Sequence, residues 1–442
     1  MIETGGSLSL VGLVTVLAII ALLVSRRVTP VVALTLVPFL GALAAGFGLS
    51  EIGGYFTSGL ASVVQVATMF IFAILFFGVL QDAGVFRPMV DFLVRLSGGS
   101  VTSVAVGTAV IGMLAHLDGA GATTFLLTIP ALLPLYHRLG MNPYLMLLLL
   151  ATGAGILNLL PWAGPLGRAA AVLELEPVAL WHPLIPVQLA GALLLVMFSV
   201  ILGRREQARV RAHGFHPAAP AAEGQGAVTP GAQAELERPR LLWPNLALLL
   251  TVLGTLVSGA LPSAYVFMIG FALVLVVNYR SVPEQMQRMN AHAPNALLMG
   301  AIILSAGSLL GILNGSGMLR SIAADLVLIL PAGIVPHLHL LIGAFGLPFD
   351  LLLSTDAYYF ALLPIVEQIA STHGVAPTTT VYALVIGNVI GTFLSPFSPA
   401  LWLALGLARL EFGKHLQYSL VPMWIFSLLL MGFAVAIGVI PL

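Results

Sequence analysis

The chain has 442 residues, of which 59% are hydrophobic and only 8% charged, and its formal net charge is zero. A soluble globular protein carries about 25% charged residues, so this composition excludes a soluble fold and indicates a membrane protein with several spans. The absence of cysteine excludes disulfides and cysteine-bound metal, and the neutral charge gives no indication of nucleic-acid binding. Apolar runs of about 20 residues favour helices over the short alternating strands of a membrane β-barrel.

The N-terminal half is predicted to be entirely helical. Its opening MIETGG lacks the basic residues of a cleaved signal peptide, so we expect the first apolar segment to be a retained span. In chain order we expect three spans, a short amphipathic stretch, a re-entrant hairpin of two closely joined apolar segments, a long broken helix and a last span. These elements cover roughly residues 8–24, 29–48, 59–82, 85–97, 101–138, 143–174 and 182–202.

One long polar segment, residues 203–240, divides the chain. It is rich in Arg, Ala, Pro and Gly and is predicted to be a flexible cytoplasmic linker between two domains, residues 1–202 and 241–442. The second domain is predicted to have the same order of elements as the first. They cover roughly residues 242–258, 262–280, 293–313, 317–331, 334–371, 377–408 and 418–440.

The two domains are related by a sequence repeat. Five Pro and Gly positions recur 234 residues later (364 − 130 = 234), namely Pro130, Gly140, Pro143, Gly153 and Pro165 as Pro364, Gly374, Pro377, Gly387 and Pro399. Four upstream positions recur after 233 residues, namely Gly78, Leu80, Gly84 and Arg87 as Gly311, Leu313, Gly317 and Arg320. Because each half has an odd number of true spans, we expect an all-α fold of two inverted repeats, with about ten full spans and two hairpins. This architecture is typical of secondary transporters that bind substrate near the membrane midplane.

The distribution of Lys and Arg predicts the orientation in the cell (inner) membrane. With both termini outside and the linker in the cytoplasm, fifteen of the 17 Lys and Arg residues fall on the cytoplasmic side. Arg320, outside, and Arg168, within the membrane, are the two that remain. The first hairpin then opens to the cytoplasm and the second to the exterior.

Polar residues interrupt the apolar sequence at four places. Two are the hairpin tips, residues 116–124 and 346–359, and two are the helix breaks, residues 158–165 and 391–399. In hydrocarbon, the unpaired backbone groups at such breaks cost several kcal/mol each unless protein, water or substrate satisfies them. Half-helix N-termini carry about +0.5 charge and suit carboxylates or phosphates. The predicted substrate-binding residues are Gly121, Thr123, Thr124, Asn158, Gly164, Arg168, Ser354, Thr355, Thr392, Ser395 and Ser398.

Ionisable residues in these interruptions suggest the coupling chemistry. Arg168 can pair with a substrate carboxylate through two hydrogen bonds. Asp118 and Asp356, one in each tip, cost at least about 2.5–3.5 kcal/mol within a membrane. They would repel an anion unless protonated or shared with a metal, so we expect coupling to protons, to a divalent cation, or to both. Asp118 can carry a proton or bind Mg²⁺ together with substrate oxygens, and His116 can titrate between about pH 5 and 8.

Structural roles compete with these functional ones. A lone Thr or Asn in a membrane helix commonly serves as a hydrogen-bonding contact between helices. Asp350 is an equally good candidate for the N-cap of the half-helix that follows it. Trp162 is expected to pack, and four residues near hairpin ends are expected at the membrane interface, namely Glu367, His337, His339 and His373.

The stretch AHLDGAGATTFLLTIPALLPLYHRLGM, followed by NLLPWAGPLGRAAAVL, resembles the citrate–metal symporter family CitMHS of the ion transporter superfamily. LSTDAYYFALLPIV and ARLEFGKH extend the resemblance to the second half, so that it covers the whole chain apart from the linker. The resemblance implies a proton-coupled importer of citrate complexed with Mg²⁺ or Ca²⁺, without a permanent cofactor. It also implies a homodimer that works by an elevator movement of the hairpin-bearing domain.

The family pattern places the site at the tips and loops already identified. Within the second tip it singles out residues 353–358, and the metal would contact Asp118 and Asp356 through the substrate complex. One departure lies at Ala120, where the family pattern can be acidic. One oxygen ligand is then absent, which leaves the metal preference open.

Several alternatives are compatible with the sequence. A proton- or sodium-coupled transporter of free di- or tricarboxylates, or of hydroxy acids such as gluconate or lactate, is the main one, because unwound carbonyls suit Na⁺. An intramembrane hydrolase built on His116 and Asp118 is disfavoured, because a catalytic zinc usually needs three protein ligands. A passive channel would not explain the acids in the tips.

Overall fold

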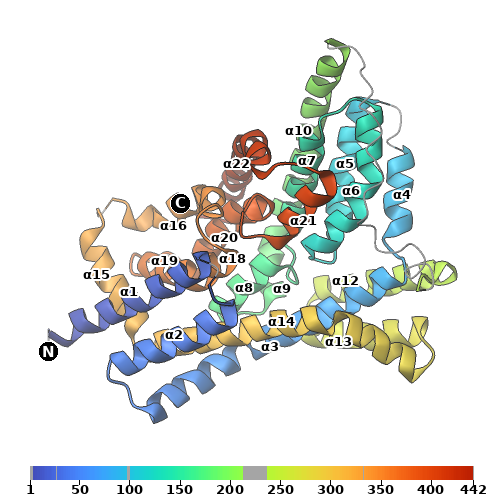
Figure 1. Ribbon diagram of the computed structural model, residues 1–442. Coiled ribbons are helices and arrows are strands. Elements are labelled where there is room, and N and C mark those ends of the chain that lie inside the picture. The colour runs from blue at the N-terminus through green and yellow to red at the C-terminus, as the bar shows by residue number, and fades with distance from the viewer. Residues whose placement is uncertain (1–2, 26, 97–99, 213–235, 332, 442) are drawn as a thin grey trace.

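The computed structural model describes residues 3–25, 27–96, 100–212, 236–331 and 333–441, and every regular element within these ranges is a helix (Figure 1). The predicted all-helical architecture is therefore confirmed. The elements up to residue 212 are α1 Glu3–Val24, α2 Pro30–Ala44, α3 Leu49–Asp82, α4 Arg87–Leu96, α5 Val101–Ala115, α6 Gly121–Arg138, α7 Pro143–Leu157, α8 Gly164–Val172, α9 Pro177–Trp181, η1 His182–Leu184 and α10 Ile185–Ala212.

The elements from residue 236 onward follow a similar order. They are η2 Pro239–Leu241, α12 Leu242–Ser258, α13 Ser263–Asn278, α14 Val282–Gly315, α15 Met318–Ile329, η3 Val335–His337, α16 Leu338–Ala344, α17 Gly346–Phe349, α18 Thr355–Ala357, η4 Tyr358–Leu362, α19 Leu363–Ser371, α20 Pro377–Asn388, η5 Val389–Phe393, α21 Pro399–Ala408 and α22 Phe412–Ala436. Five helical stretches among the described residues are long and apolar enough to cross a membrane, and they include α3, α14 and α22. The chain is thus an integral membrane protein.

The linker predicted for residues 203–240 is shorter in the structure. Helix α10 continues past residue 202 to Ala212, and the chain is again described from residue 236. Residues 213–235, the middle of the predicted linker, lie outside the described residues. The helix extends because its last turns are anchored: Glu206 is only 6% exposed and binds the loop that follows α6.

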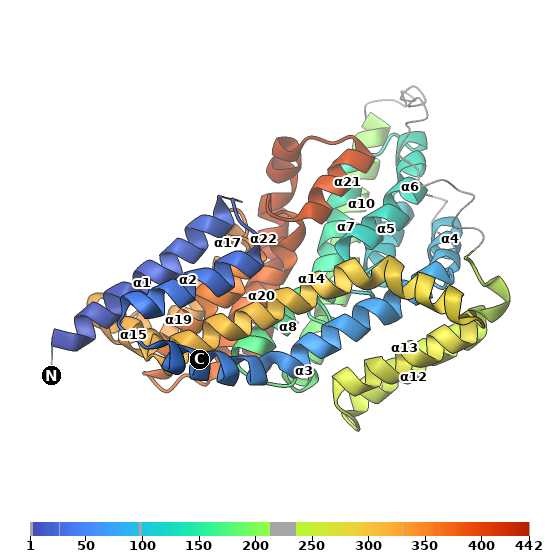
Figure 2. The ribbon, with the colours of Figure 1, turned by 60° about the horizontal axis from the view of Figure 1, so that its bottom comes forward.

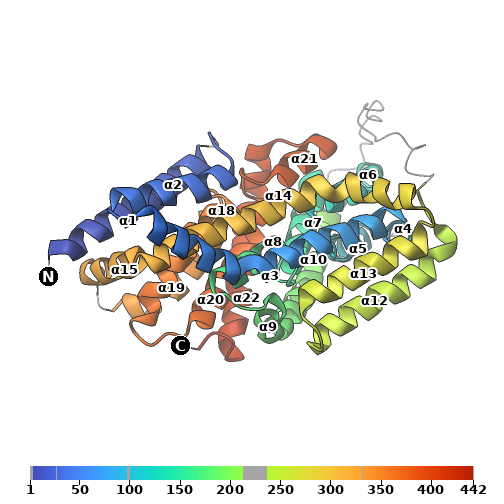
Figure 3. The ribbon, with the colours of Figure 1, turned by 90° about the horizontal axis from the view of Figure 1, so that it is seen from below.

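The longest helices, α3 and α14, lie side by side and run along the length of the molecule (Figures 2 and 3). Helices α1 and α2 lie toward one end of this pair and α12 and α13 toward the other (Figure 3). The two backbones approach closely at glycines: a Cβ on Gly59 would lie 2.1 Å from the Gly307 carbonyl oxygen, and one on Gly311 would lie 2.2 Å from the Tyr55 oxygen. Small residues at membrane helix contacts permit this close packing.

An ion pair fastens the C-terminal end of α3 to α14. The Asp82 carboxylate accepts a hydrogen bond from Arg288 at 3.2 Å, and its same oxygen lies 2.8 Å from the His292 ring nitrogen. The α3–α14 pair is therefore held by close van der Waals contact toward the start of α3 and by charge at the end of α3. Such a pair is suited to act as a rigid support for the shorter, broken helices.

The hairpins and broken helices pack together in the same way in both halves. In the first half, a Cβ on Gly153 of α7 would lie 3.0 Å from the Ala109 oxygen of α5. In the second, a Cβ on Gly387 of α20 would lie 1.8 Å from the Gly343 oxygen of α16. Each hairpin's first arm therefore packs directly on the first part of the broken helix that follows it.

Substituting Gly311 by Ala should destabilise the protein, because the new methyl group meets backbone atoms of α3 that no rotamer change can move. Overpacking of this kind typically costs about 1–3 kcal/mol. The measurement is thermal unfolding of the purified protein in detergent. Gly254→Ala in α12 is the matched control, because nothing lies within 4 Å of its Cβ position. Equal melting temperatures for the two variants would contradict the close contact.

Candidate functional site

The four polar interruptions predicted from the sequence meet in the structure as a closed ring of contacts. The first tip contacts the first break, because the Trp162 ring nitrogen donates to the Leu117 oxygen at 2.8 Å. The first break contacts the second tip through Arg168 and Asp356. The second tip contacts the second break, whose Ser395 hydroxyl donates to a tip carbonyl at 2.6 Å. The second break returns to the first tip through the ring of Phe393.

His116 organises the first tip. It ends α5 and is fully buried, with one ring nitrogen 2.7 Å from the Thr124 hydroxyl and the other 3.1 Å from the Asn158 side-chain oxygen. The imidazole thus joins both arms of the hairpin to the break between α7 and α8. The Asn158 amide nitrogen is buried and has no protein partner, so one donor at this junction remains available.

Asp118 is bound within its own tip. One carboxylate oxygen accepts from the Ala120 backbone N–H at 2.9 Å, and the other accepts from the Thr123 hydroxyl. Gly119 between them adopts φ +71°, a left-handed conformation that favours glycine over residues with a Cβ. The tip is thereby folded into a compact turn at the start of α6, and Asp118 and His116 have different partners.

Phe393 of the second break packs against the first tip. Its ring meets those of His116 and Phe125 edge to face, with centroids 5.3 and 5.2 Å apart. A Cβ on Gly121 would lie 2.4 Å from a Phe393 ring carbon, so the start of α6 fits against the ring only with glycine at this position. Gly121 thus has a packing role.

Arg168 and Asp356 form a buried ion pair across the two halves of the chain. The guanidinium Nε donates to a carboxylate oxygen at 2.7 Å, and the side chains are only 9% and 13% exposed. Arg168 comes from α8, directly after the first break, and Asp356 from α18, in the second tip. A Cβ on Gly164 would lie 2.5 Å from an Arg168 terminal nitrogen, so this glycine leaves room for the guanidinium.

The second tip is capped by Ser354 and not by Asp350. The Ser354 hydroxyl accepts from the Ala357 N–H at 3.2 Å and begins α18, with Thr355 as its first residue. The cap role considered for Asp350 is therefore wrong, because its carboxylate is buried and accepts no hydrogen bond. Behind the tip, the Tyr359 hydroxyl donates to the Asn388 side-chain oxygen at 3.0 Å.

The remaining predicted residues are engaged locally. The Thr123 and Thr124 hydroxyls donate to the Ala120 carbonyl, and the Thr392 hydroxyl donates to the Val389 carbonyl of its own short helix. Ser398 precedes α21 as its N-cap residue, but its side chain makes no cap hydrogen bond. Trp162 packs among aromatic rings, as expected, and its indole also fixes the first tip.

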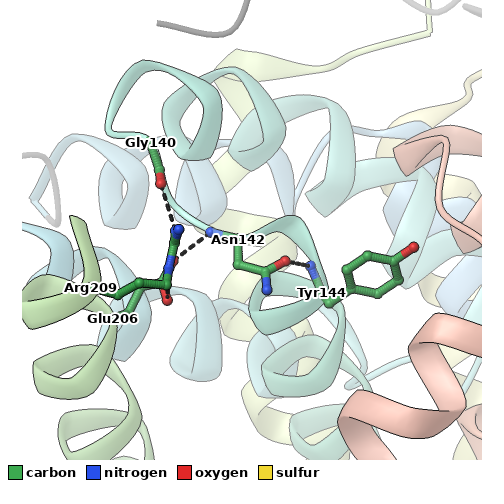
Figure 4. A network of polar contacts seen from close by, with 5 residues as sticks. All are labelled: Gly140, Asn142, Tyr144, Glu206 and Arg209. Carbon is green, nitrogen blue, oxygen red and sulfur yellow. Dashed lines mark hydrogen bonds and ion pairs between the residues drawn. The ribbon is translucent and has the colours of Figure 1, made fainter. Parts of the chain in front are cut away.

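A second polar network fixes the base of the first hairpin (Figure 4). Glu206 of α10 accepts from the Asn142 backbone N–H and from Arg209, each at 2.6 Å. Arg209 also donates to the Gly140 carbonyl at 2.8 Å, while the Asn142 side chain caps α7 by accepting from the Tyr144 N–H. The backbone of the turn between α6 and α7 is therefore bound by two charged side chains of α10.

Sequence reasoning missed two participants of the site. Phe393 lies within the predicted second break, but its apolar side chain gave no sign of its contact with His116. Asn388 is a lone amide in α20, of the kind assigned by default to a structural role. Only the three-dimensional arrangement places both between the tips, where they complete the contacts of the second break.

Solved structures with the same fold are transporters. The YdaH transporter of Alcanivorax borkumensis is similar with a TM-score of 0.59 and 18% identity, over 88% of both chains. MtrF of Neisseria gonorrhoeae is similar with a TM-score of 0.61 and 16% identity, over 87% of this chain and 83% of that one. The chain therefore shares the fold of these two proteins.

Sequence comparison identifies the family. Residues 13–387 match CitMHS, the citrate transporter family. Two Bacillus subtilis (strain 168) proteins are each 36% identical: the "Citrate transporter" over 93% of this chain and 95% of its own length, and the "Mg(2+)/citrate complex secondary transporter" over 98% and 99%. The chain belongs to the CitMHS family and is a secondary transporter, not an enzyme.

Removing one member of the Arg168–Asp356 pair should be strongly destabilising. Either Arg168→Ala or Asp356→Ala leaves an uncompensated buried charge, which typically costs about 3–5 kcal/mol. The double variant should lose much less stability than the two single variants together, as measured by thermal unfolding in a double-mutant cycle. The exposed Arg87–Glu237 pair is the control, with an expected coupling of about 0–1 kcal/mol. Additive losses at Arg168 and Asp356 would show that the pair is not formed.

Proposed function

We propose that this protein imports citrate as its complex with a divalent metal ion, Mg²⁺ or Ca²⁺, together with protons. The observation that carries the proposal is the buried Arg168–Asp356 ion pair at the junction of the two tips and two breaks. The Arg168 guanidinium is a cation that suits a carboxylate. When a substrate carboxylate takes the place of Asp356 beside it, Asp356 must move or change its charge. The family and the name of its Mg²⁺/citrate relative support the substrate.

Arg168 is the proposed anchor for one citrate carboxylate. The other citrate carboxylates would be bound by the Asn158 amide nitrogen, which has no protein partner, and by the hydroxyls of Ser354, Thr355 and Ser398. The half-helices α8 and α21 begin at the two breaks and add positive N-terminal ends. These groups together offer charge and hydrogen-bond donors to a compact tricarboxylate.

The metal ion would travel with the substrate. Among the described residues no group of three or more His, Asp or Glu side chains is placed to hold a metal ion. Citrate oxygens would therefore supply most of the coordination, and Asp118 and Asp356 would contact the complex as hard oxygen ligands. Because position 120 is alanine, the first tip provides one carboxylate, which favours a metal already largely coordinated by citrate.

The transport cycle would exploit the two-fold organisation of the chain. Two inverted repeats, residues 1–202 and 241–442, would place the hairpins on opposite sides of the membrane. The hairpins and broken helices would move as an elevator against a homodimeric scaffold that includes α3 and α14. Both termini would lie outside and the linker in the cytoplasm of the cell (inner) membrane, as the Lys and Arg distribution predicts.

The direct test is uptake of labelled citrate into proteoliposomes. We expect uptake only with Mg²⁺ or Ca²⁺ present and faster uptake under an inward proton gradient. Arg168→Ala should abolish citrate binding, while Arg168→Lys should retain part of it because a lysine keeps the charge but loses the planar fork. Undiminished uptake in excess chelator would rule out the metal complex as substrate, and indifference to the gradient would rule out proton coupling.

The alternative substrate class is a free di- or tricarboxylate or a hydroxy acid, coupled to protons or to Na⁺. The same site groups would bind it, since carbonyls freed at the breaks suit Na⁺. Competition of citrate, succinate and gluconate for binding without metal separates the two proposals. A sodium gradient that replaces the proton gradient would favour the alternative.

A further inference from the structure

Asp350 is a buried acid that the proposed substrate site does not use. It follows α17 in the second hairpin and is 1% exposed, neither carboxylate oxygen accepts a hydrogen bond of normal geometry, and the polar group that interacts with the carboxylate is the neutral amide of Asn388. Its backbone is firmly held, because the Ser395 hydroxyl donates to its carbonyl at 2.6 Å. The carboxylate itself lies against Gly391, where a Cβ would come within 2.5 Å of its Oδ2 atom.

The groups around Asp350 do not balance a negative charge. Tyr358 and Tyr359 of η4 are neutral phenols, and the guanidinium of Arg168, which acts on Tyr359, is already paired with Asp356. The Asn388 amide interacts with the Asp350 carboxylate and also donates to the Gly346 carbonyl, but it is neutral and cannot balance a charge. The helices packed on α17 carry further titratable side chains: His339, Tyr382, Lys414, His415 and Tyr418. Within the described residues, none of these forms an ion pair with Asp350.

An ionised carboxylate in such a place is too costly to persist. Burying an isolated charge without a partner costs many kcal/mol, and buried groups in proteins neutralise instead. Mg²⁺ and Ca²⁺ do not fit here, because each needs about six or more oxygen ligands or waters at about 2.0–2.6 Å. Both Asp350 oxygens are in contact with protein atoms, and Gly391 occupies the space beside them. A proton is the cation that fits.

We propose that Asp350 binds a transported proton, which it holds in the conformation described here and releases when the second hairpin separates from η5. Binding converts the carboxylate to a neutral acid, and release restores the carboxylate once water reaches it. The hairpin packs closed on Gly391 only when the acid is neutral, so the proton is a condition for closure. Five residues of π-helix, η4, follow directly on α18, and such irregular turns are frequent at functional sites.

This role is separate from those of the other two acids. Asp356 has the Arg168 guanidinium as its counter-ion, and Asp118 accepts hydrogen bonds from Ala120 and Thr123. Both carboxylates have donors that compensate a negative charge, which suits contact with a metal complex. Asp350 lies within the second tip and packs against the second break, so proton and substrate would bind at different positions of the same hairpin. This role rests on the proposed proton coupling, for which Asp350 is the proton-binding residue.

The experiment uses the full chain in proteoliposomes, with Mg²⁺–citrate as the probe. Asp350→Asn is the main variant, because asparagine copies the neutral acid in size and shape. We expect it to retain citrate–citrate exchange without a gradient. Each coupled proton contributes about tenfold to the accumulation ratio per unit of pH gradient, so accumulation at one unit should fall about tenfold. Asp91→Asn, at an exposed position in α4, should accumulate citrate like the wild type.

The outcomes separate this inference from the proposed function. If the wild type ignores the gradient, proton coupling itself fails; if Asp350→Asn accumulates citrate like the wild type, the role of Asp350 is overturned. A second measurement covers a variant that loses exchange altogether. Thermal stability of the wild type should fall as pH rises, because the closed packing holds a proton that the unfolded chain releases, whereas Asp350→Asn should lack this component. If the thermal stability of the two proteins depends on pH in the same way, the role of Asp350 is overturned.

Discussion

The structure depends on the requirement that every broken helix in a membrane must find partners for its exposed backbone groups. Two hairpins and two helix breaks would be prohibitively costly if each faced lipid separately. They are instead brought together, so that each tip contacts both breaks through His116, Phe393, Ser395 and the Arg168–Asp356 pair. The close glycine contacts of α3 and α14 provide the support that this arrangement needs. The candidate site is thus a consequence of satisfying the backbone.

Much of this arrangement could be predicted from the sequence. Pro and Gly at the breaks identify where helices stop, because proline removes a donor and clashes with the preceding turn. The predicted tips and breaks therefore coincide with interruptions between α5 and α6, α7 and α8, α17 and α18, and η5 and α21. Arg168 and Asp356 could be selected as functional because charges are rare in membrane helices. Their mutual contact could not, since nothing local relates positions 188 residues apart.

Other features depend on packing and left no local sign. Asp118 and Asp350 are both acids in a hairpin. Asp118 accepts two hydrogen bonds within its own tip, whereas neither Asp350 oxygen accepts one of normal geometry. That difference is decided by the neighbours each tip meets, which come from distant parts of the chain. The extension of α10 beyond residue 202 has the same origin. Its polar composition resembles a linker, and its contacts account for the helix: Glu206 and Arg209 bind the turn before α7, and Gln207 accepts from Thr102 of α5.

The contact at the base of the first hairpin also has a mechanical consequence. Glu206 and Arg209 bind the Gly140–Asn142 turn by hydrogen bonds of 2.6–2.8 Å, which a relative shift of even a few ångströms would break. The hairpin and α10 must therefore travel together or separate at a measurable energetic cost. The chain continues directly from α10 toward the second half, so a displacement of α10 would also displace the turn before α7.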